Sequence, residues 1–399
     1  MNRYDVLVIG GGLIGCASAC YLARRGLRVF LAEKNDLNSL ASGQNAGSLH
    51  FQLEHRLIEH GDALAAQFAQ VLPLNAYASR LWAGLEEDLG ASLGVRMDGG
   101  LMLAATDEET ELLHKKQALE SKSGIDTRML KGAALRACAP YLGEDVRAAS
   151  FLATEGSANP RLVTLAYARA AAKAGAGVYA GCEVAALSRG GGVWRADLIG
   201  ANAPAARICA DNVLNAAGAF AGRAALLAHL HLPVMPVPLM MCVTDRAPPA
   251  IPHLVQRAGA RLSMKQARDG NIIIGGGWPA RFRTANGTPD FSRRPKLIHS
   301  NVARNLALAV QAAPLVAQRR LLRCWTGVVG VTPDQLPYLG AVSKSSGFYA
   351  AVGGSGFTLG PAYASLMAEL IATGETSLDI SAYDPARLSS VNGFMEGAA

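Results

Sequence analysis

Apolar and polar positions predict a strand, a helix and a second strand at the start of the chain. Residues 4–9 are almost continuously apolar, which is typical of a strand buried on both faces of a parallel sheet. A glycine-rich turn follows, and residues 16–25 then carry the small and apolar side chains of a packed helix, which Gly26 ends. A second apolar run over residues 28–32 closes with Glu33. The pattern therefore predicts a βαβ unit.

The same contrast between apolar and polar positions predicts elements farther along the chain. A helix over residues 361–373 is indicated by apolar side chains on one face, and Gly374 supplies its C-cap. The asparagine–proline pair at 159–160 favours the start of a helix over residues 161–174. The other predicted elements are a hairpin at 269–270 between strands 261–267 and 271–275, a helix over 304–317 that Pro314 interrupts, and a strand over 347–352.

The turn within the βαβ unit reads G-x-G-x-x-G. Gly10 permits the tight turn, Gly12 lets the backbone approach a diphosphate, and Gly15 lets helix and strand pack closely. Glu33 lies about 20 residues farther on, where its carboxylate can bind a ribose hydroxyl and would repel a 2′-phosphate. We therefore predict a dinucleotide site that disfavours NADP. The predicted contacts of this cofactor also include the neighbouring residues Leu13, Ile14 and Lys34.

The glycine motif leaves alternatives open. It is compatible with a purely structural glycine turn, and by itself it does not distinguish NAD from FAD. A second match to the motif, over residues 275–280, follows a predicted strand. We reject this match as a nicotinamide site, because Pro279, Arg281 and Arg283 do not begin an apolar helix.

Composition excludes several classes of protein. Of the 399 residues, 50% are hydrophobic and 17% are charged, which a disordered chain does not show. The net charge of +7 is scattered without a run of like charges, so no nucleic-acid partner is expected. The seven cysteines include no C-x-x-C pair, so we expect no metal site and a reducing, cytoplasmic compartment. Glycines or prolines interrupt the apolar stretches 6–22 and 226–243, so we expect no integral membrane segment.

A polar, glycine-rich loop, Gly43-Gln44-Asn45-Ala46-Gly47-Ser48-Leu49, follows the second predicted strand and has the composition to line an extended cofactor. Segments 182–184, 211–219, 323–327, 332–334 and 353–361 lie farther along the chain. With the glycine motif, these segments resemble the D-amino-acid oxidase-like (DAO) family of FAD-dependent oxidoreductases over nearly the whole chain. The flavin-bearing β subunits of opine, hydroxyproline and sarcosine-type dehydrogenases are the most similar members, and glycine oxidase is also similar.

The resemblance implies a non-covalently bound FAD. The loop at 353–359 would place the start of the last helix where its amide groups stabilise negative charge on a reduced flavin. Cys324 lies near the position where some sarcosine oxidases carry a covalent flavin, but its register is shifted. The FAD contacts that the resemblance implies, beyond those above, are Ser42, Gln44, Asn45, Ala46, Gly47, Ser48, Leu49, Val184, Ala216, Ala217, Gly218, Trp325, Gly327, Gly354, Ser355, Gly356, Phe357, Thr358 and Leu359.

The resemblance also implies an α/β fold with two domains. An FAD-binding, Rossmann-like domain of the glutathione-reductase type would take residues 1–93, 145–232 and 321–399. A substrate domain of α+β type, built on a mixed sheet, would take residues 94–144 and 233–320.

The activity implied by the resemblance is FAD-dependent oxidation of a C–N bond in a secondary amine or N-substituted amino acid. A hydride would pass to flavin N5, and the imine product would hydrolyse. The usual clamp for a substrate carboxylate is not visible, because Val329 and Ser263 occupy its positions. Solvated strand charges and core side chains are the alternatives for the candidates that follow. We predict His50 and Lys265 as catalytic residues, and Arg261, Trp278 and Arg281 as substrate-binding residues.

Members of this kind often work beside a second subunit that passes electrons on. We expect such a partner here, because the chain has no cysteine cluster of its own for a relay. Three other interpretations stay open: a flavin-binding scaffold subunit without its own amine site, an FAD amino-acid oxidase that uses oxygen, and an NAD dehydrogenase.

Overall fold

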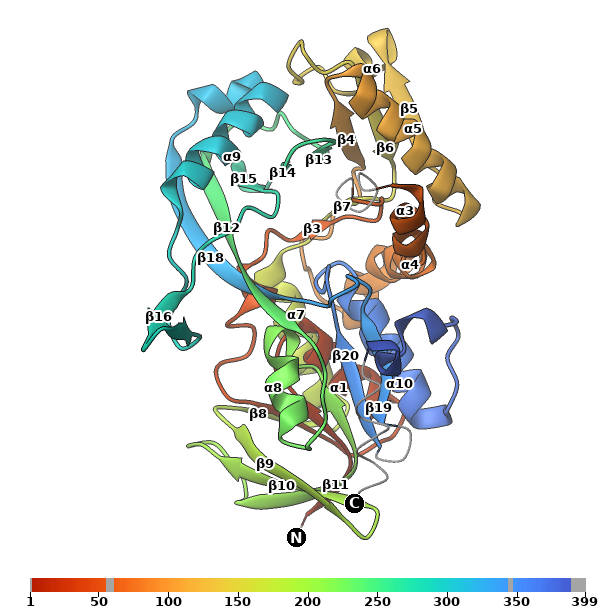
Figure 1. Cartoon of the computed structure of the whole chain (residues 1–399), viewed down its shortest axis with the longest axis vertical. Coiled ribbons are helices and arrows are strands. Elements are labelled where there is room, and N and C mark those ends of the chain that lie inside the picture. The colour runs from red at the N-terminus through yellow and green to blue at the C-terminus, as the bar shows by residue number, and fades with distance from the viewer. Residues whose placement is uncertain (1, 55–60, 344–346, 389–399) are drawn as a thin grey trace.

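The computed structural model describes residues 2–54, 61–343 and 347–388. The molecule is elongated, with one β-sheet in a lower lobe and a second sheet in an upper lobe (Figure 1). Two long antiparallel strands, β12 (Met235–Arg246) and β18 (Leu321–Val331), run from the upper lobe toward the lower one.

The lower lobe is built on a sheet whose central strands are parallel. β1 (Arg3–Ile9) lies between β2 (Val29–Glu33) and β11 (Arg207–Asn215) and pairs in parallel with both. The central residues of β1 are fully buried, so cover on both faces explains its continuous apolar run. The sheet also contains β8 (Gly177–Ala180) beside β2, then β20 (Phe348–Val352) and β19 (Tyr338–Ser343) beyond β11, and an antiparallel extension of β10 (Val193–Ile199) and β9 (Glu183–Gly190).

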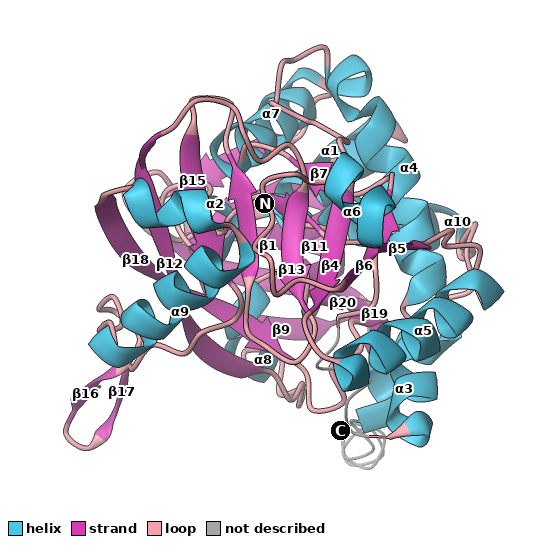
Figure 2. Ribbon diagram, turned by 90° about the horizontal axis from the view of Figure 1, so that it is seen from above, coloured by secondary structure: helices cyan, strands magenta, loops and turns pink. Residues whose placement is uncertain are grey.

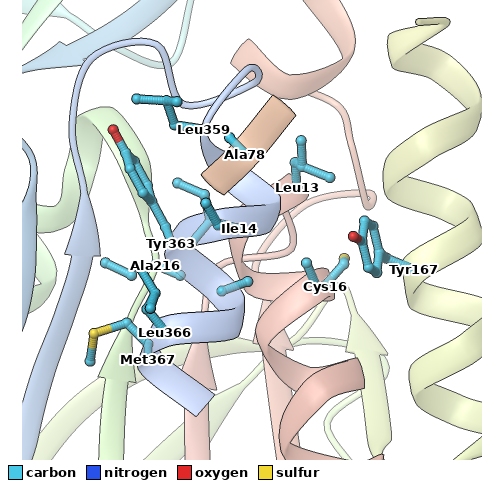
Figure 3. Close-up of a cluster of buried hydrophobic side chains, with 14 of the residues drawn as sticks. Leu13, Ile14, Cys16, Ala78, Tyr167, Ala216, Leu359, Tyr363, Leu366 and Met367 are labelled. Atoms are coloured by element: carbon cyan, nitrogen blue, oxygen red, sulfur yellow. The ribbon is translucent and has the colours of Figure 1, made fainter. Parts of the chain in front are cut away.

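Three helices pack together against this sheet. α1 (Leu13–Arg24) contacts both α7 (Pro160–Lys173) and α10 (Gly360–Thr373). Nearly all the small side chains of α1 are buried, which lets the two neighbouring helices approach it closely. Figure 3 shows this core, in which Ile14 of α1 lies beside Tyr363 of α10.

The upper lobe contains a mixed sheet, seen from above in Figure 2. Helices α5 (Asp107–Lys122), α6 (Gly132–Cys138) and α9 (His299–Ala312) pack against its strands. Only the pair β4–β13 is parallel among the neighbours in this sheet, within the described residues. In spatial order the strands are β18, β12, β15 (Asn271–Gly275), β14 (Ser263–Gln266), β13 (Leu254–Arg257), β4 (Gly100–Ala104), β6 (Ala148–Leu152) and β5 (Arg128–Lys131).

Shorter elements complete the fold. The hairpin of β16 (Arg283–Ala285) and β17 (Thr288–Asp290) projects from the body in Figure 1. Along the parts of the chain that the structure describes, no helix is long and apolar enough to cross a membrane. The other elements are α2 (Ala41–Gln44), β3 (Ser48–Leu49), α3 (Asp62–Ala69), α4 (Leu72–Leu89), β7 (Gly156–Ser157), α8 (Ala221–Leu226) and 3₁₀ turns at Gly218–Phe220, Pro314–Gln318, Ser381–Tyr383 and Pro385–Leu388.

Most of the predicted elements are confirmed. The βαβ unit, the hairpin at 269–270 and the last helix are present, and Asn159 caps α7 by accepting the Arg161 N–H. The helix predicted over 304–317 instead begins at His299 and ends at Ala312. A 3₁₀ turn follows this helix, because a proline at position 314 cannot continue it.

The predicted domain boundaries differ from the sheets of the structure. β6 and β18, which those boundaries assign to the FAD-binding domain, are strands of the upper sheet. β18 pairs with β12 along its whole length and so continues the upper sheet toward the lower lobe. Because this one strand extends from one lobe toward the other, the sequence near residue 321 carries no local signal of a domain boundary. Residues 389–399, at the end of the predicted FAD-binding domain, lie outside the described residues.

Candidate active site

The turn between β1 and α1 has a shape that excludes side chains. Gly10 has a φ of +112°, and a Cβ added there would lie 2.6 Å from the Ala216 carbonyl oxygen. A Cβ on Gly15 would overlap the Gly10 carbonyl oxygen, so α1 can approach the turn only through a glycine. At Gly12 an added Cβ would meet the Ser42 hydroxyl at 2.9 Å. This glycine cradle (Gly10, Gly12 and Gly15) therefore offers bare backbone to an approaching diphosphate.

A cavity of about 100 Å³ lies in front of the glycine cradle. Glu33 reaches it and accepts a hydrogen bond from the Gly11 N–H at 2.7 Å. The Ser42 hydroxyl accepts the Leu13 N–H at 2.9 Å. Gly12, the N-cap of α1, has no side chain, so the N–H groups of the first turn beyond Leu13 can bind a negatively charged group. The predicted cofactor residues that line this cavity are Gly10, Gly12, Leu13, Ile14, Glu33, Ser42, Ala216, Ala217 and Gly218.

Two other predicted contacts lie beside this cavity. The Lys34 ammonium group is 5.5 Å from the ring centre of Phe220, which lines the cavity. Val184 is buried in β9, close to the end of β2, where the Cys182 N–H donates to the Glu33 carbonyl at 2.8 Å. The structure thus brings 182–184 next to the predicted ribose carboxylate.

Two loops that are far apart in the sequence meet beyond the first cavity. The Thr358 hydroxyl donates to the Ser48 carbonyl at 3.1 Å, and the Trp82 indole N–H donates to the Thr358 carbonyl at 2.6 Å. The Trp325 indole N–H donates to the Gln44 carbonyl at 2.6 Å. Residues 44–50, called the 44–50 loop, therefore join both β18 and residues 353–359, called the 353–359 loop.

These loops expose groups that suit a flavin. α10 follows the 353–359 loop and has no side-chain cap at Leu359, so its first N–H groups are available to an anionic ligand. The Ser48 hydroxyl is buried and has no hydrogen-bond partner among the described residues. A cofactor that spans from the glycine cradle to these loops would contact, in order, the backbone of the cradle, the Glu33 carboxylate and the N-terminus of α10. The residues present therefore fit FAD.

A small cavity of about 70 Å³ adjoins the 44–50 loop at His50. His50 Nε2 lies 3.1 Å from Ser263 Oγ, and Nδ1 contacts the side-chain amide of Gln256. Ser355 donates to a Glu54 carboxylate oxygen at 3.4 Å. Ser355 has a φ of 52°, and strained non-glycine residues of this kind gather at functional sites. The described residues around the small cavity include this glutamate and no lysine or arginine.

A large cavity of about 1010 Å³ is lined by Gln44, Asn45 and Ala46 of the same loop. Lys265 of β14 lines it, is only 6% exposed and donates from Nζ to the Gly47 carbonyl at 2.8 Å. Burial, with Arg96 nearby, lowers the pKa of Lys265 to about 7. His50 and Lys265 thus both tie β14 to the 44–50 loop, but they border different cavities. The cationic residues around the large cavity are Arg96, Arg161, Lys265, Arg268, Arg294 and Arg323.

Comparison with known proteins decides the family. The model of the family described as FAD dependent oxidoreductase (DAO) matches residues 5–370. The chain belongs to the DAO family. It is therefore an FAD-dependent oxidoreductase. By their geometry, the glycine cradle, Glu33 and the two loops would hold FAD.

Relatives within the DAO family match nearly the whole chain. Glycine oxidase of Geobacillus kaustophilus (strain HTA426) is 30% identical over 391 residues, which covers 97% of this chain and 97% of the relative. An opine oxidase subunit of Rhizobium meliloti is 26% identical over 405 residues, which covers 98% of this chain and 99% of the relative. The crystal structure of glycine oxidase from Geobacillus kaustophilus matches with a TM-score of 0.83 at 27% identity, covering 97% of this chain and 99% of that chain.

The three residues predicted to bind substrate line none of the cavities described above. Arg261 donates from Nη1 to the Gly277 carbonyl at 2.8 Å, and the Trp278 indole N–H donates to the Arg261 carbonyl at 2.8 Å. Arg281 forms a backbone bridge with Lys296 and is exposed. The described polar groups of Arg261 and Trp278 therefore bind the turn after β15, and the Arg281 side chain faces solvent.

Sequence reasoning did not identify a buried charge network behind His50. Glu155 accepts the N–H groups of Phe51 (2.7 Å) and Gln52 (2.8 Å), and Glu120 accepts the Leu53 N–H at 2.8 Å. Lys116 Nζ donates to Glu120 at 2.8 Å and to the Gln52 side chain at 2.7 Å. The three charged side chains are buried, and burial raises the pKa of Glu155 to about 7. The only sequence signal was a lysine and a glutamate four residues apart on a helix.

Lys265→Met is expected to flatten the dependence of stability on pH. Because the pKa of Lys265 is about 7 in the folded state and 10.5 for an ordinary lysine, the unfolded chain binds more protons between these limits. Wild-type stability should therefore rise by about 2 kcal/mol from about pH 7 to about pH 9, and the variant should lack this rise. Urea unfolding with saturating FAD measures it. The exposed-site variant Lys122→Met should keep the wild-type dependence, and a wild-type-like rise in Lys265→Met would contradict the assignment.

Proposed function

We propose that the chain is a dehydrogenase that oxidises the C–N bond of a secondary amine or N-substituted amino acid of the sarcosine, proline, hydroxyproline or opine type. The product is an imine, which water hydrolyses. The observation that carries the proposal is the meeting of the 44–50 and 353–359 loops beside a cavity that His50 lines. The near-complete match to a relative named as an opine oxidase subunit supports the substrate class.

Each group around the small cavity has a task in this reaction. When bound between the 44–50 and 353–359 loops, FAD would supply two-electron oxidation by hydride acceptance. Glu54 places a carboxylate at the cavity wall, where the nitrogen of an amine can bind to it. His50, oriented by Ser263 and Gln256, can accept the proton of the ammonium group, so that the amine reacts in its neutral form. The uncapped start of α10 stabilises negative charge at the cofactor ring.

Anaerobic stopped-flow mixing of the holoenzyme with sarcosine, proline, hydroxyproline and opines tests this function. We expect at least one of these compounds to bleach the flavin absorption band at a rate that saturates with its concentration. If dithionite bleaches the band and none of the amines does, the proposed substrate class is wrong. An oxygen-electrode trace with the best amine then shows whether the reduced enzyme consumes oxygen, as an oxidase would.

A flavin-binding scaffold subunit without its own amine site is the second candidate. The small size of the cavity at His50 favours it, as does the lack of a lysine or arginine among the described residues of its lining. Bleaching by an amine only after a partner protein is added would support this alternative.

His50→Gln is expected to slow reduction of the flavin by the best amine by about a hundredfold or more, because the variant cannot take up the ammonium proton. The FAD content should stay at the wild-type level, since the glycine cradle is untouched. Rapid-mixing reduction rates measure the effect, and the exposed-site variant His114→Gln is the matched control. An unchanged reduction rate in His50→Gln would remove His50 from the mechanism.

We also propose a second subunit that passes the electrons on. The relative from Rhizobium meliloti supports this proposal, because its name describes one subunit of an opine oxidase and so implies a partner in that enzyme. The seven free cysteines of the chain support the cytoplasm as its compartment. Copurification of one partner with the tagged chain from its native cell, together with faster electron transfer to an external acceptor, is the expected result.

A further inference from the structure

Two cysteines on neighbouring strands face each other beside the large cavity. Cys242 of β12 and Cys324 of β18 are directly opposite in the antiparallel register, and their Sγ atoms are 3.4 Å apart. Directly opposite residues of such a pair have Cα atoms about 4.5–5.5 Å apart, which lies within the range of about 4.4–6.8 Å found for disulfides. Both cysteines are free thiols in the structure, so the pair is placed for a bond that has not formed.

The two thiols differ in their access to solvent. Cys242 is fully buried beneath α9, where Asn305 Nδ2 lies 3.9 Å from its sulfur. Cys324 is partly exposed and lines the large cavity. A small oxidant entering this cavity therefore meets Cys324 first. Burial, with the neighbouring thiol, raises the pKa of Cys242 to about 12, so Cys242 stays protonated until its partner has reacted.

We propose that Cys242 and Cys324 form a redox-active dithiol site, which a peroxide or a small disulfide converts reversibly into a disulfide. With hydrogen peroxide, Cys324 Sγ attacks one oxygen, the O–O bond breaks, and a sulfenic acid and one water form. The Cys242 sulfur then attacks Cys324 Sγ, the S–S bond forms, and the second water leaves. The two thiols together lose two protons and two electrons, and one peroxide is reduced to two waters.

The position of the dithiol couples it to the FAD site. Cys324 directly precedes Trp325, whose indole N–H holds the Gln44 carbonyl of the 44–50 loop. Bond formation brings the sulfurs from 3.4 Å to about 2.05 Å and so draws the side chains of β12 and β18 together at this point. Oxidation should therefore change the surroundings of Trp325. This inference stands independently of the amine that the enzyme oxidises.

Peptide mapping of the oxidised holoenzyme tests the site. The reduced protein is treated with hydrogen peroxide or glutathione disulfide, denatured, alkylated and digested, and the peptide masses are measured by mass spectrometry. We expect a linked pair of peptides containing Cys242 and Cys324, the loss of two alkylable thiols, and recovery of both on reduction with dithiothreitol. Cys16 and Cys20, which are buried in α1, should remain alkylable thiols and serve as internal controls. Tryptophan fluorescence should shift on oxidation and return on reduction.

Two variants separate the steps of the reaction. Cys242→Ser should leave the oxidation at the sulfenic acid of Cys324, which dimedone traps, and Cys324→Ser should give neither a disulfide nor an adduct. Both variants should still bind FAD. Neither should show the fluorescence shift that the wild type shows on oxidation and loses again on treatment with dithiothreitol. The inference is overturned if both cysteines of the wild type remain alkylable after oxidation, or if Cys324 is found bonded to the flavin.

Discussion

Gly15→Ala is expected to weaken FAD binding by up to about a hundredfold. The added Cβ would overlap the Gly10 carbonyl oxygen, so α1 has to move away from the turn that receives the diphosphate. Forcing a side chain into a packed contact costs about 1–3 kcal/mol, which corresponds to a loss of affinity of up to about a hundredfold. The ratio of flavin to protein absorbance after purification and an FAD titration followed by fluorescence measure the loss.

Two further alanine variants separate cofactor binding from folding. Gly12→Ala adds a Cβ that meets only the movable Ser42 side chain, so the unfolding midpoint should stay near that of the wild type while FAD binding weakens. Gly84→Ala is the matched control, because it lies within α4 with no atom near its added Cβ and should stabilise the helix by about 1 kcal/mol. A Gly12→Ala protein that binds FAD as tightly as the wild type would refute the diphosphate cradle.

The FAD end of the site was predictable because its requirements act on neighbouring residues. A buried parallel strand needs a continuous apolar run, and the close approach of α1 to that strand needs a glycine at position 15. Glu33 ends β2, so its distance from the motif follows from the length of one helix and one strand. The uncapped start of α10 follows in the same way from a glycine-rich loop and a helical pattern. In each case a local pattern determines where the functional group lies.

The substrate end depends on contacts between distant segments, which local patterns in the sequence do not reveal. Ser263 and Lys265 lie on one face of β14, because side chains two residues apart in a strand share a face, and both contact the 44–50 loop. Arg261 has the same parity but precedes β14, and its guanidinium group binds the turn at Gly277 instead. Alternation along the sequence indicates which residues share a face, but it does not indicate which segment packs against that face.

The burial of charged side chains on α5 likewise depends on contacts that a local pattern does not reveal. Removing one of these charges is expected to lower the stability of the protein strongly. Residues 107–122 are rich in acids and lysines and suggest a helix exposed to solvent, yet Lys116 and Glu120 are both 0% exposed. Lys116→Met would leave the Glu120 carboxylate buried without its charge partner. Removing one partner of a buried ion pair costs about 3–5 kcal/mol, so we expect a loss of this size in the free energy of unfolding, measured with urea.

A second substitution at Glu120 distinguishes the unpaired charge from lost packing. Lys116→Met/Glu120→Gln keeps an oxygen that can accept the Leu53 N–H and removes the stranded charge, so part of the lost stability should return. Arg147→Met, in an ion pair whose aspartate is 90% exposed, should give no resolvable change. If the double variant is no more stable than Lys116→Met, the charge of Lys116 is not what matters. The packing of its aliphatic stem then stabilises the residues that follow His50.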